Sequence, residues 1–378
     1  MYVVGICSKN CEDTIAHVIK TVDEGLDTYF AQEQNLIILS DLSEDRTHEV
    51  ARNTETKVEK IILTQEGGPG KGNGVKTILK EVQKRRASGV ALVDGDLTSV
   101  QPDWISKLLT PIQEGYDEVI PFYIRHPYDG VITNQIAYPL TTVLYGKEIR
   151  QPIGGEFSLS GEATGKILKN PLFPQEFGID IFLSTTGIVE DLKIVETVLG
   201  FKEHTSTKEY KDPMKLLIPM YYQVLNSLFD LYLGYKDKAK KVTTISKVER
   251  IGEIPQGETK SPSVDKDRWF RQIRQDYRER IGDISRIDFL SSIKDEIKPH
   301  LEKEEITLPL EVWAKCVFLS LNNYGYDKQR TLDVLRVFWE ARYMGLVRET
   351  ENMPQEEAES RIQDQVRVFW KYRNMLKF

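Results

Sequence analysis

The stretch Ala91-Leu-Val-Asp94-Gly95-Asp96-Leu97-Thr98-Ser99 decides the expected fold. Its apolar start is typical of a buried strand, and two carboxylates separated by one residue follow where that strand ends. A turn at this point would let both carboxylates reach one ligand. Hard divalent cations take carboxylate oxygens together with substrate phosphate oxygens, and two acids are too few for a closed protein cage. The stretch therefore indicates a metal site completed by a diphosphate, although Asp-Gly-Asp also occurs in ordinary turns.

Composition and charge narrow the class of protein. The chain has 378 residues, of which 40% are hydrophobic and 29% are charged, so it can bury a sizeable core. Its net charge of −7 offers no general attraction to nucleic acid or to anionic membranes. The sparse cysteines Cys7, Cys11 and Cys316 argue against a disulfide framework, and no second Cys/His pair completes a zinc site. The start of the chain resembles a core strand rather than a signal peptide, so we expect a cytoplasmic protein.

Strands and helices alternate through the first half of the chain. Buried strands are expected at 3–6, 35–40, 58–63, 91–94, 115–124 and 194–201. Helices are expected after Cys11, after Asp45, at 75–86, at 132–145, from Phe177 and at 213–235. This alternation predicts an α/β fold with a mostly parallel central sheet, whose ligands gather at the carboxyl ends of the strands. Polar residues interrupt the apolar helix at 213–235, which argues against a membrane span.

The second half of the chain is charged and has a helical pattern. We expect a catalytic domain over 1–215 and a mainly α-helical C-terminal region over 216–378, with a possible boundary within 252–262, where Lys, Gly and Pro concentrate. Trp313, Trp339 and Trp370 are candidate core anchors. This half carries no chemical motif, and its helices could close over the site or pair subunits.

A glycine-rich loop, Gly67-Gly-Pro-Gly-Lys71-Gly-Asn-Gly74, precedes the third expected helix. It has the composition of a phosphate loop but lacks the Gly-x4-Gly-Lys-Ser/Thr spacing of nucleoside triphosphatases. A flexible backbone near a helix N-terminus, together with one lysine, suits an anionic leaving group or sugar hydroxyls. A plain glycine turn is the alternative interpretation.

Two further sets of polar residues are candidates for ligand binding. Arg125, Asp129 and Thr133 would share one helix face if a helix begins near Pro127. An arginine fork is a natural grip for a small carboxylate, whereas the alternative is a surface ion pair. His204 follows the last expected strand of the first domain and is a candidate third metal ligand, with a structural role as the alternative.

Taken together, these segments resemble the retaining A-type glycosyltransferases, and within them the family that makes mannosylglycerate and glucosylglycerate. The resemblance is carried, in the family's order, by Pro69-Gly-Lys71-Gly-Asn-Gly74, Asp94–Ile105, the Arg125/Asp129/Thr133 set, Gln151-Pro-Ile-Gly-Gly-Glu156, Gly178-Ile-Asp180 and His204. It covers roughly residues 1 to 215. The family implies an A-type fold, a nucleotide-diphosphate sugar donor, a Mg2+ or Mn2+ ion and transfer with retention of configuration.

The resemblance also implies a role for each matching residue. The metal ligands would be Asp96 and His204, with Asp94 near the metal or the ribose. Donor binding would involve Lys9, Asp41, Lys71, Gly72, Asp94, Gly95 and Asp180. Acceptor binding would involve Arg125, Asp129, Thr133, Gly154 and Gly155. The catalytic residues would be Asp96, Lys71, Asp180 and Glu156, with Glu156 as the candidate nucleophile if retention proceeds by double displacement rather than by same-face attack.

These observations lead to an expected function and two alternatives. We expect a hexosyltransferase that moves mannose or glucose from a nucleotide-diphosphate sugar, expected to be GDP-linked, to glycerate or a similar small hydroxy acid, giving a compatible solute. A close alternative is a glucosyl-3-phosphoglycerate synthase, which would need more basic residues for the acceptor phosphate. A distant alternative is a non-catalytic scaffold, against which the presence of both Asp94 and Asp96 argues. The expected partners are the two substrates and, through the C-terminal helices, a possible second copy of the chain.

Overall fold

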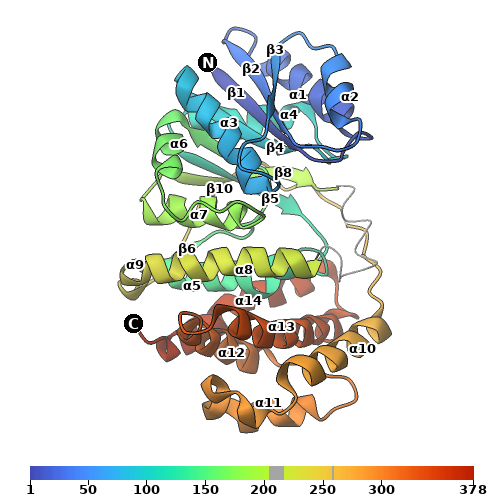
Figure 1. Ribbon diagram of the computed structural model, residues 1–378, viewed down its shortest axis with the longest axis vertical. Helices are drawn as coiled ribbons and strands as arrows, with labels where there is room; N and C mark the ends of the chain where they lie inside the picture. Colours follow the sequence, from blue (N-terminus) through green and yellow to red (C-terminus); the bar gives the residue numbers. More distant parts are fainter. Residues whose placement is uncertain (204–216, 258) are drawn as a thin grey trace. The chain divides into compact units, whose positions relative to one another are not determined.

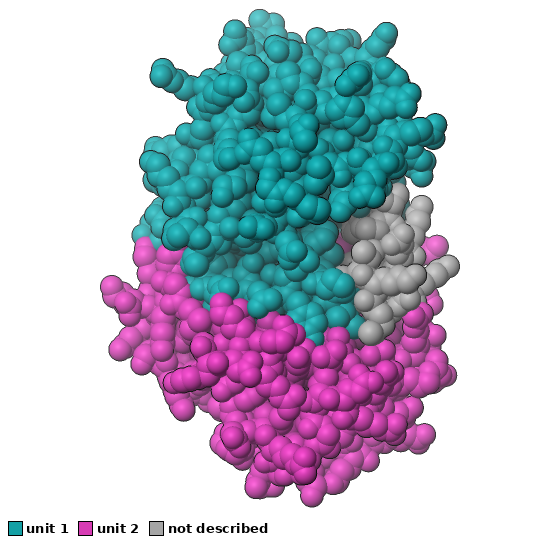
Figure 2. All heavy atoms as spheres, viewed as in Figure 1, with its two compact units in different colours: residues 1–124, 149–231, 247–256 teal, residues 125–148, 232–246, 257–378 magenta. Residues whose placement is uncertain are grey.

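The computed structural model describes residues 1–203, 217–257 and 259–378. The chain forms two compact units, which Figure 2 shows in different colours. Unit 1 comprises Met1–Ile124, Ile149–Leu231 and Lys247–Gln256, and unit 2 comprises Arg125–Glu148, Tyr232–Ser246 and Gly257–Phe378. The segment 125–148, which we expected in the first domain, therefore belongs to unit 2, while a division of the chain at residue 215 stays a prediction.

Unit 1 is built on one eight-stranded sheet with the strand order β10-β8-β5-β7-β4-β1-β2-β3. Its strands are β1 (Tyr2–Ser8), β2 (Asn35–Asp41), β3 (Glu59–Thr64), β4 (Gly89–Asp94), β5 (Glu118–Ile124), β7 (Ser158–Ser160), β8 (Ile194–Phe201) and β10 (Glu249–Ile251). All pairs are parallel except those of β7, which runs antiparallel to both β4 and β5. The expected α/β class with a mostly parallel central sheet is confirmed.

Helices cover both faces of this sheet (Figure 1). On one face, α1 (Ile15–Tyr29) packs beside α4 (Pro102–Gln113), and α2 (Thr47–Asn53) contacts α1. On the other face, α3 (Lys71–Arg85) packs beside α6 (Gly161–Leu168), and α7 (Ile179–Val189) contacts both. The helix expected at 75–86 begins four residues earlier, at Lys71, which brings that lysine into its first turn.

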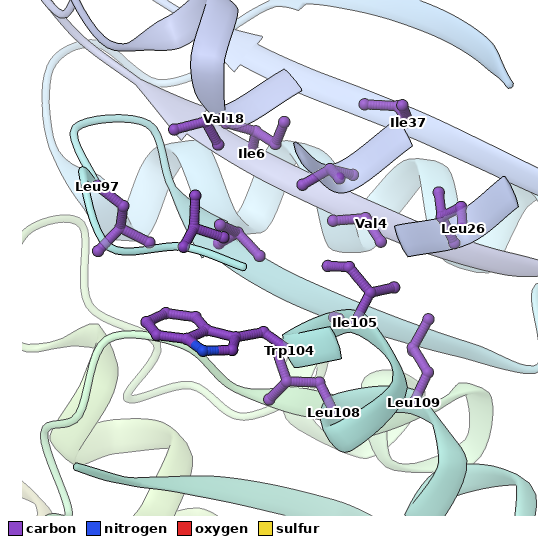
Figure 3. Close-up of a cluster of buried hydrophobic side chains, with 14 of the residues drawn as sticks. Val4, Ile6, Val18, Leu26, Ile37, Leu97, Trp104, Ile105, Leu108 and Leu109 are labelled. Carbon is purple, nitrogen blue, oxygen red and sulfur yellow. The ribbon is translucent and has the colours of Figure 1, made fainter. Parts of the chain in front are cut away.

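The core between the sheet and helices α1 and α4 fixes the loop that carries the two carboxylates. Side chains of β1, α1 and α4 interlock there, among them Ile6, Val18 and Ile105 (Figure 3). Leu97, the residue after Asp96, is fully buried in the same cluster. Burying a leucine side chain stabilises a fold by about 1.5–3 kcal/mol. The loop after β4 is therefore held by the core, and its carboxylates start from a fixed backbone.

Unit 2 is mainly helical. Its helices are a π-helical turn (Thr133–Ala137), α5 (Tyr138–Tyr145), α9 (Lys236–Lys240), α10 (Lys266–Asp276), α11 (Lys294–Leu301), α12 (Leu310–Asn323), α13 (Lys328–Thr350) and α14 (Gln355–Tyr372). Shorter helical turns lie at Tyr277–Ile281, Ile284–Arg286, Asp288–Ile293 and Arg373–Met375. Of the three expected anchors, Trp313 and Trp339 are fully buried, whereas Trp370 is partly exposed.

The remaining elements lie where the chain passes between the units in sequence. Helix α8 (Leu217–Gly234) falls mostly in unit 1, with its last three residues in unit 2. Two short strands, β6 (Lys147–Glu148) and β9 (Ser246–Lys247), pair with each other. Across the part of the chain that the structure describes, no helix has both the length and the apolar character needed to cross a bilayer. The cysteines are free, and burial raises the pKa of Cys7 and of Cys11 to about 12.

Candidate active site

Lys71 is the centre of a charged cluster at the carboxyl ends of the strands in unit 1. Its Nζ lies 2.9 Å from Oδ1 of Asp94, the last residue of β4, and 3.1 Å from Oδ1 of Asp180, in the first turn of α7. The carbonyl of Gly155 lies 3.3 Å from the same nitrogen. Three segments far apart in sequence therefore meet at one ammonium group, and three of the expected donor residues are brought together.

Burial and charge act against each other at this cluster. Burial lowers the pKa of Lys71, but the carboxylates of Asp180, Asp94 and Glu156 outweigh it and hold that pKa well above its ordinary value. Burial raises the pKa of Asp180 despite the opposing effect of Lys71, and Asp94 adds to the rise. Lys71 thus stays charged. Its positive charge offsets the negative charges of the neighbouring carboxylates, which would otherwise repel a bound anion.

A second ion pair, with buried side chains, lies beside the first. Lys202 Nζ is 2.7 Å from Oε2 of Glu156 and donates to the Gly154 carbonyl at 2.8 Å. The hydroxyl of Tyr123, on β5, donates to the same Glu156 oxygen. The Glu156 side chain is wholly buried, so its carboxylate faces protein groups.

Gly155 separates the two ion pairs and allows them to approach. Its φ is +102°, a left-handed conformation that disfavours any residue with a Cβ. An added Cβ would lie 2.6 Å from Lys202 Nζ, closer than real contacts allow, and 3.0 Å from Asp94 Oδ2, which is tighter than most real contacts. Gly154 and Gly155, which we expected at the acceptor, therefore carry the carbonyls that hold the two lysines.

The Asp94-Gly95-Asp96 turn is tied to neighbouring elements of unit 1. The Gly95 N–H donates to the Cys7 carbonyl at 3.0 Å, and Thr14 Oγ1 donates to the Gly95 carbonyl at 2.8 Å. Asp96 is partly exposed, as a ligand for an incoming metal and diphosphate must be. The expected turn is thus present at the end of β4.

The residue before His204 lies against the same turn. The Thr98 N–H donates to the Glu203 carbonyl at 3.1 Å, and the Glu203 N–H donates to Ser99 Oγ at 2.8 Å. His204 itself, the expected third metal ligand, lies outside the described residues. Within the described ranges, no group of three or more His, Cys, Asp and Glu side chains could hold a metal ion.

Asp41 and Lys9 stand at the ends of neighbouring strands in different surroundings. Asp41, at the end of β2, is buried, and its Oδ1 accepts from Ser8 Oγ at 2.8 Å and from Ser43 Oγ at 2.6 Å. Lys9, after β1, is exposed. Two hydroxyl donors fix the orientation of the Asp41 carboxylate, whereas the Lys9 side chain lies at the surface.

The N-terminus of α3 is covered by a loop of the same unit. The Gly72 N–H donates to the Glu176 carbonyl at 3.2 Å, and the Asn73 N–H donates to the Gln175 carbonyl at 2.9 Å. A Cβ at Gly72 would lie 2.2 Å from the Pro174 carbonyl oxygen. These two amides therefore donate to the loop in this structure, and donor binding by Gly72 stays a prediction.

Arg125, Asp129 and Thr133 come together in unit 2. Arg125 Nε lies 2.9 Å from Oδ2 of Asp129, and a Cβ placed on Gly130 would lie 3.6 Å from Thr133 Oγ1 and 3.9 Å from the Arg125 guanidinium carbon. The expectation that they share one helix face is wrong, because Arg125 and Asp129 lie in a turn and only Thr133 is helical. The three side chains still lie close together around Gly130, because the chain turns between Arg125 and Thr133.

Sequence reasoning missed Lys202 and Tyr123. Both lie at the carboxyl ends of strands, Lys202 directly after β8 and Tyr123 near the end of β5. A lysine in that position is a usable signal, because the carboxyl edge of a parallel sheet is where ligands gather. The tyrosine carries no such signal, since aromatic residues are common in strands for packing alone.

A family model matches the first part of the chain. Residues 3–167 match the family model described as Glycosyl transferase family 2. Residues 3–167 therefore carry a glycosyltransferase family 2 domain, the central sheet has the A-type fold, and the resemblance inferred from the sequence is confirmed.

The chain is also similar to three individual proteins. Mannosylglycerate synthase from Rhodothermus marinus is 28% identical over 160 residues, which cover 39% of this chain and 40% of that protein. Glucosyl-3-phosphoglycerate synthase from Mycolicibacterium smegmatis is 26% identical over 243 residues, covering 58% of this chain and 73% of that protein. The solved structure of glucosyl-3-phosphoglycerate synthase from Mycobacterium tuberculosis with Mn2+, UDP and glucosyl-3-phosphoglycerate is 24% identical, with a TM-score of 0.48, covering 61% of this chain and 79% of that chain. The chain thus spans less than half the length of the mannosylglycerate synthase that it matches.

Proposed function

We propose that this chain is a metal-dependent glycosyltransferase that moves mannose or glucose from a nucleotide-diphosphate sugar to glycerate or a similar small hydroxy acid, with retention of configuration. The observation that carries the proposal is the cluster of Lys71, Asp94 and Asp180, of which Lys71 and Asp94 lie within the stretch that matches the family 2 glycosyltransferase model. Fold alone does not fix an activity, so the proposal rests on this site.

The donor sugar and its diphosphate occupy the carboxyl edge of the sheet. Lys71 keeps its charge between two acids, so it can orient a sugar hydroxyl or offset the charge of the departing diphosphate. Asp180 accepts a hydroxyl of the hexose. Asp41, fixed by two serine hydroxyls at the end of β2, receives a donor group of the nucleoside.

Asp96 and Asp94 fit a hard divalent cation by their chemistry, because both supply carboxylate oxygens at a turn that the core holds in place. Asp96 is the ligand that the resemblance implies, and its side chain is partly exposed. We propose His204 as a further ligand, supported by the bonds that join Glu203 to Thr98 and Ser99. When bound, Mg2+ or Mn2+ supplies Lewis-acid stabilisation of the leaving nucleoside diphosphate.

Transfer takes place by same-face attack. The acceptor hydroxyl forms the new bond to the anomeric carbon as the bond to the diphosphate breaks, and its proton passes to an oxygen of the leaving phosphate. No carboxylate nucleophile is needed. The burial of Glu156 and its bonds from Lys202 and Tyr123 support this route over double displacement, because they leave Glu156 a positioning role.

The acceptor acid is bound by Arg125, Asp129 and Thr133. A guanidinium is suited to a carboxylate, and a carboxylate and a hydroxyl are suited to the hydroxyls of a small hydroxy acid. Support comes from the convergence of the three side chains around Gly130. Positioning of this kind raises rates without any bond chemistry of its own.

A second candidate acceptor is 3-phosphoglycerate. It is favoured by one observation, the match to glucosyl-3-phosphoglycerate synthase over 58% of this chain, which is longer than the match to mannosylglycerate synthase. The two acceptors differ by a phosphate, so they are separated by a substrate test.

The test is release of nucleoside diphosphate from UDP- and GDP-linked mannose and glucose with Mg2+ or Mn2+. Each donor is combined with glycerate, lactate, 3-phosphoglycerate or no acceptor, and the anomeric configuration of the product is read by NMR. Turnover that requires metal and glycerate and gives the retained anomer supports the proposal. If 3-phosphoglycerate is the one acid that supports turnover, it replaces glycerate as the proposed acceptor. If no donor is turned over with any of these acids, the proposed function is overturned.

A further inference from the structure

The helix that carries Thr133 has a break in its hydrogen bonding, inside unit 2. The Tyr138 N–H donates to the Thr133 carbonyl, five residues earlier, which forms the π-helical turn. Pro139 has no N–H, so it cannot donate to the Asn134 carbonyl in π-helical geometry or to the Gln135 carbonyl in α-helical geometry. Both residues are buried, and a buried carbonyl without a donor is costly.

Two side chains from the C-terminal helices supply the missing donors. Trp313 Nε1, on α12, donates to the Gln135 carbonyl at 2.7 Å. Gln365 Nε2, on α14, donates to the Asn134 carbonyl, also at 2.7 Å. Both side chains are fully buried, so water does not compete for these bonds. The C-terminal helices therefore complete the hydrogen bonding of a helix more than 170 residues earlier in the chain.

The same backbone is linked to the turn that holds Arg125 and Asp129. Asn134 Nδ2 donates to the carbonyls of Pro127 and Asp129, at 3.0 and 2.8 Å. A third C-terminal helix, α13, contacts the turn as well, because Tyr128 Oη lies 3.3 Å from the Val347 carbonyl. The bond from Gln365 thus fixes the backbone of Asn134, whose side chain in turn fixes the backbone of Asp129.

We infer that Trp313 and Gln365 are positioning residues for acceptor binding, acting through the Gln135 and Asn134 carbonyls. The inference rests on the proposed function, and it gives the helical C-terminal region a role in substrate specificity. Neither residue belongs to the set that binds the acid. They hold the π-helical turn and the preceding turn in one conformation, so that the Arg125 fork and the Thr133 hydroxyl meet a small hydroxy acid already oriented.

The test is Trp313→Phe in the full chain, which keeps an aromatic ring and removes the N–H donor. The matched control is Trp370→Phe on α14, where the tryptophan is partly exposed and stacks on Arg373. Steady-state KM is measured separately for the acceptor and for the nucleotide sugar. We expect the acceptor KM of Trp313→Phe to rise by at least about fivefold, with the donor KM unchanged, because one buried hydrogen bond is lost. Gln365→Leu should shift the acceptor KM in the same direction.

The outcomes separate this inference from the proposed function. If the wild-type chain transfers sugar and Trp313→Phe has the same acceptor KM as Trp370→Phe, the inference is overturned. The inference is also overturned if kcat falls and both KM values rise in proportion to a lower Tm. Such a general effect would mean that Trp313 has a structural role alone. If the wild-type chain transfers no sugar, the proposed function fails. Amide hydrogen exchange then tests whether Trp313 holds the π-helical turn and the preceding turn in place. Faster exchange of residues 128–138 in Trp313→Phe than in Trp370→Phe supports it, and equal exchange contradicts it.

Discussion

Lys202 Nζ lies 2.7 Å from Oε2 of Glu156, and both side chains are buried in unit 1. Removing one partner of such a pair leaves an uncompensated charge, whereas removing both does not. We therefore predict that the variants Lys202→Met and Glu156→Gln are each destabilised and that the double variant loses less than their sum. The coupling free energy from denaturant unfolding at pH 8, above the pKa of about 7 to which burial raises Glu156, should be about 1–3 kcal/mol.

The exposed pair of Lys107 and Asp103 on α4 is the matched control, with an Nζ–Oδ2 distance of 2.8 Å. Its coupling should be about 0.5 kcal/mol or less, because solvent screens the charges and the two residues are four apart on a helix. Equal coupling in the buried and exposed pairs would contradict the assignment of a buried, closed ion pair.

The buried carboxyl of Glu156 also predicts a pH dependence of stability. Burial raises its pKa from 4.5 to about 7, against the lowering effect of Lys202. Between these two values the folded state holds a proton that the unfolded state has released, so the free energy of unfolding falls as the pH rises through this window and levels off above it. Glu156 should contribute a slope of up to about 1.4 kcal/mol per pH unit.

The measurement is urea unfolding of the wild-type chain and of Glu156→Gln from pH 5 to pH 8. The variant lacks the titrating group, so its stability should fall less steeply with pH. Parallel curves for the two proteins would show that Glu156 has an ordinary pKa in the folded state.

Gly155→Ala should impair both stability and transfer. The residue has φ +102°, and its new Cβ would lie 2.6 Å from Lys202 Nζ and 3.0 Å from Asp94 Oδ2. Gly115→Ala is the matched control, because Gly115 has φ +89° and an added Cβ there would meet nothing within 4 Å. Backbone strain alone costs about 1 kcal/mol in each variant. Thermal unfolding and kcat should therefore fall further in Gly155→Ala, and equal effects would argue against close packing of the two lysines at Gly155.

Arg125→Lys should weaken acceptor binding without affecting the donor. The substitution keeps the positive charge but removes the planar fork that grips a carboxylate. The acceptor KM should rise roughly 10- to 100-fold, since hydrogen bonds to charged groups are worth about 1.5–3 kcal/mol. Arg85→Lys is the control, because Arg85 also pairs with an acid four residues away in sequence. Its Nε lies 2.7 Å from Oε1 of Glu81 on α3. An unchanged acceptor KM in Arg125→Lys would place the acid elsewhere.

The sequence predicted the sheet and the residues at its carboxyl edge because local patterns carry that information. The strand 91–94 and the turn after it are visible as an apolar run followed by Asp-Gly-Asp, and the core cluster around Leu97 agrees with them. The three-residue strand β10 was not predicted, since Glu249 and Arg250 give it no apolar run. Its place beside β8 depends on tertiary pairing alone.

The ion pair of Lys202 and Glu156 could not be predicted, because 46 residues separate its members and no spacing rule connects two strand-end residues of opposite charge. The turn around Arg125 shows a different limit. Four-residue spacing suggested a helix face, but Gly130 adopts φ +68° and the helix begins after it. A glycine in the left-handed region ends helical geometry, so the spacing of Arg125 and Asp129 reflects a turn.

The measurement that tests the account most directly is calorimetric titration of the full chain with UDP and with GDP, in the presence and absence of Mn2+. The proteins are the wild type, Asp96→Ala and the control Asp103→Ala, whose aspartate makes a surface pair with Lys107 in α4. The account predicts that at least one nucleotide binds only with Mn2+, that Asp96→Ala weakens this binding at least about tenfold, and that Asp103→Ala leaves it unchanged. Nucleotide binding that is equally tight without the metal, or equally tight in Asp96→Ala, would contradict the assignment of a metal-dependent nucleotide-sugar site at the carboxyl end of β4.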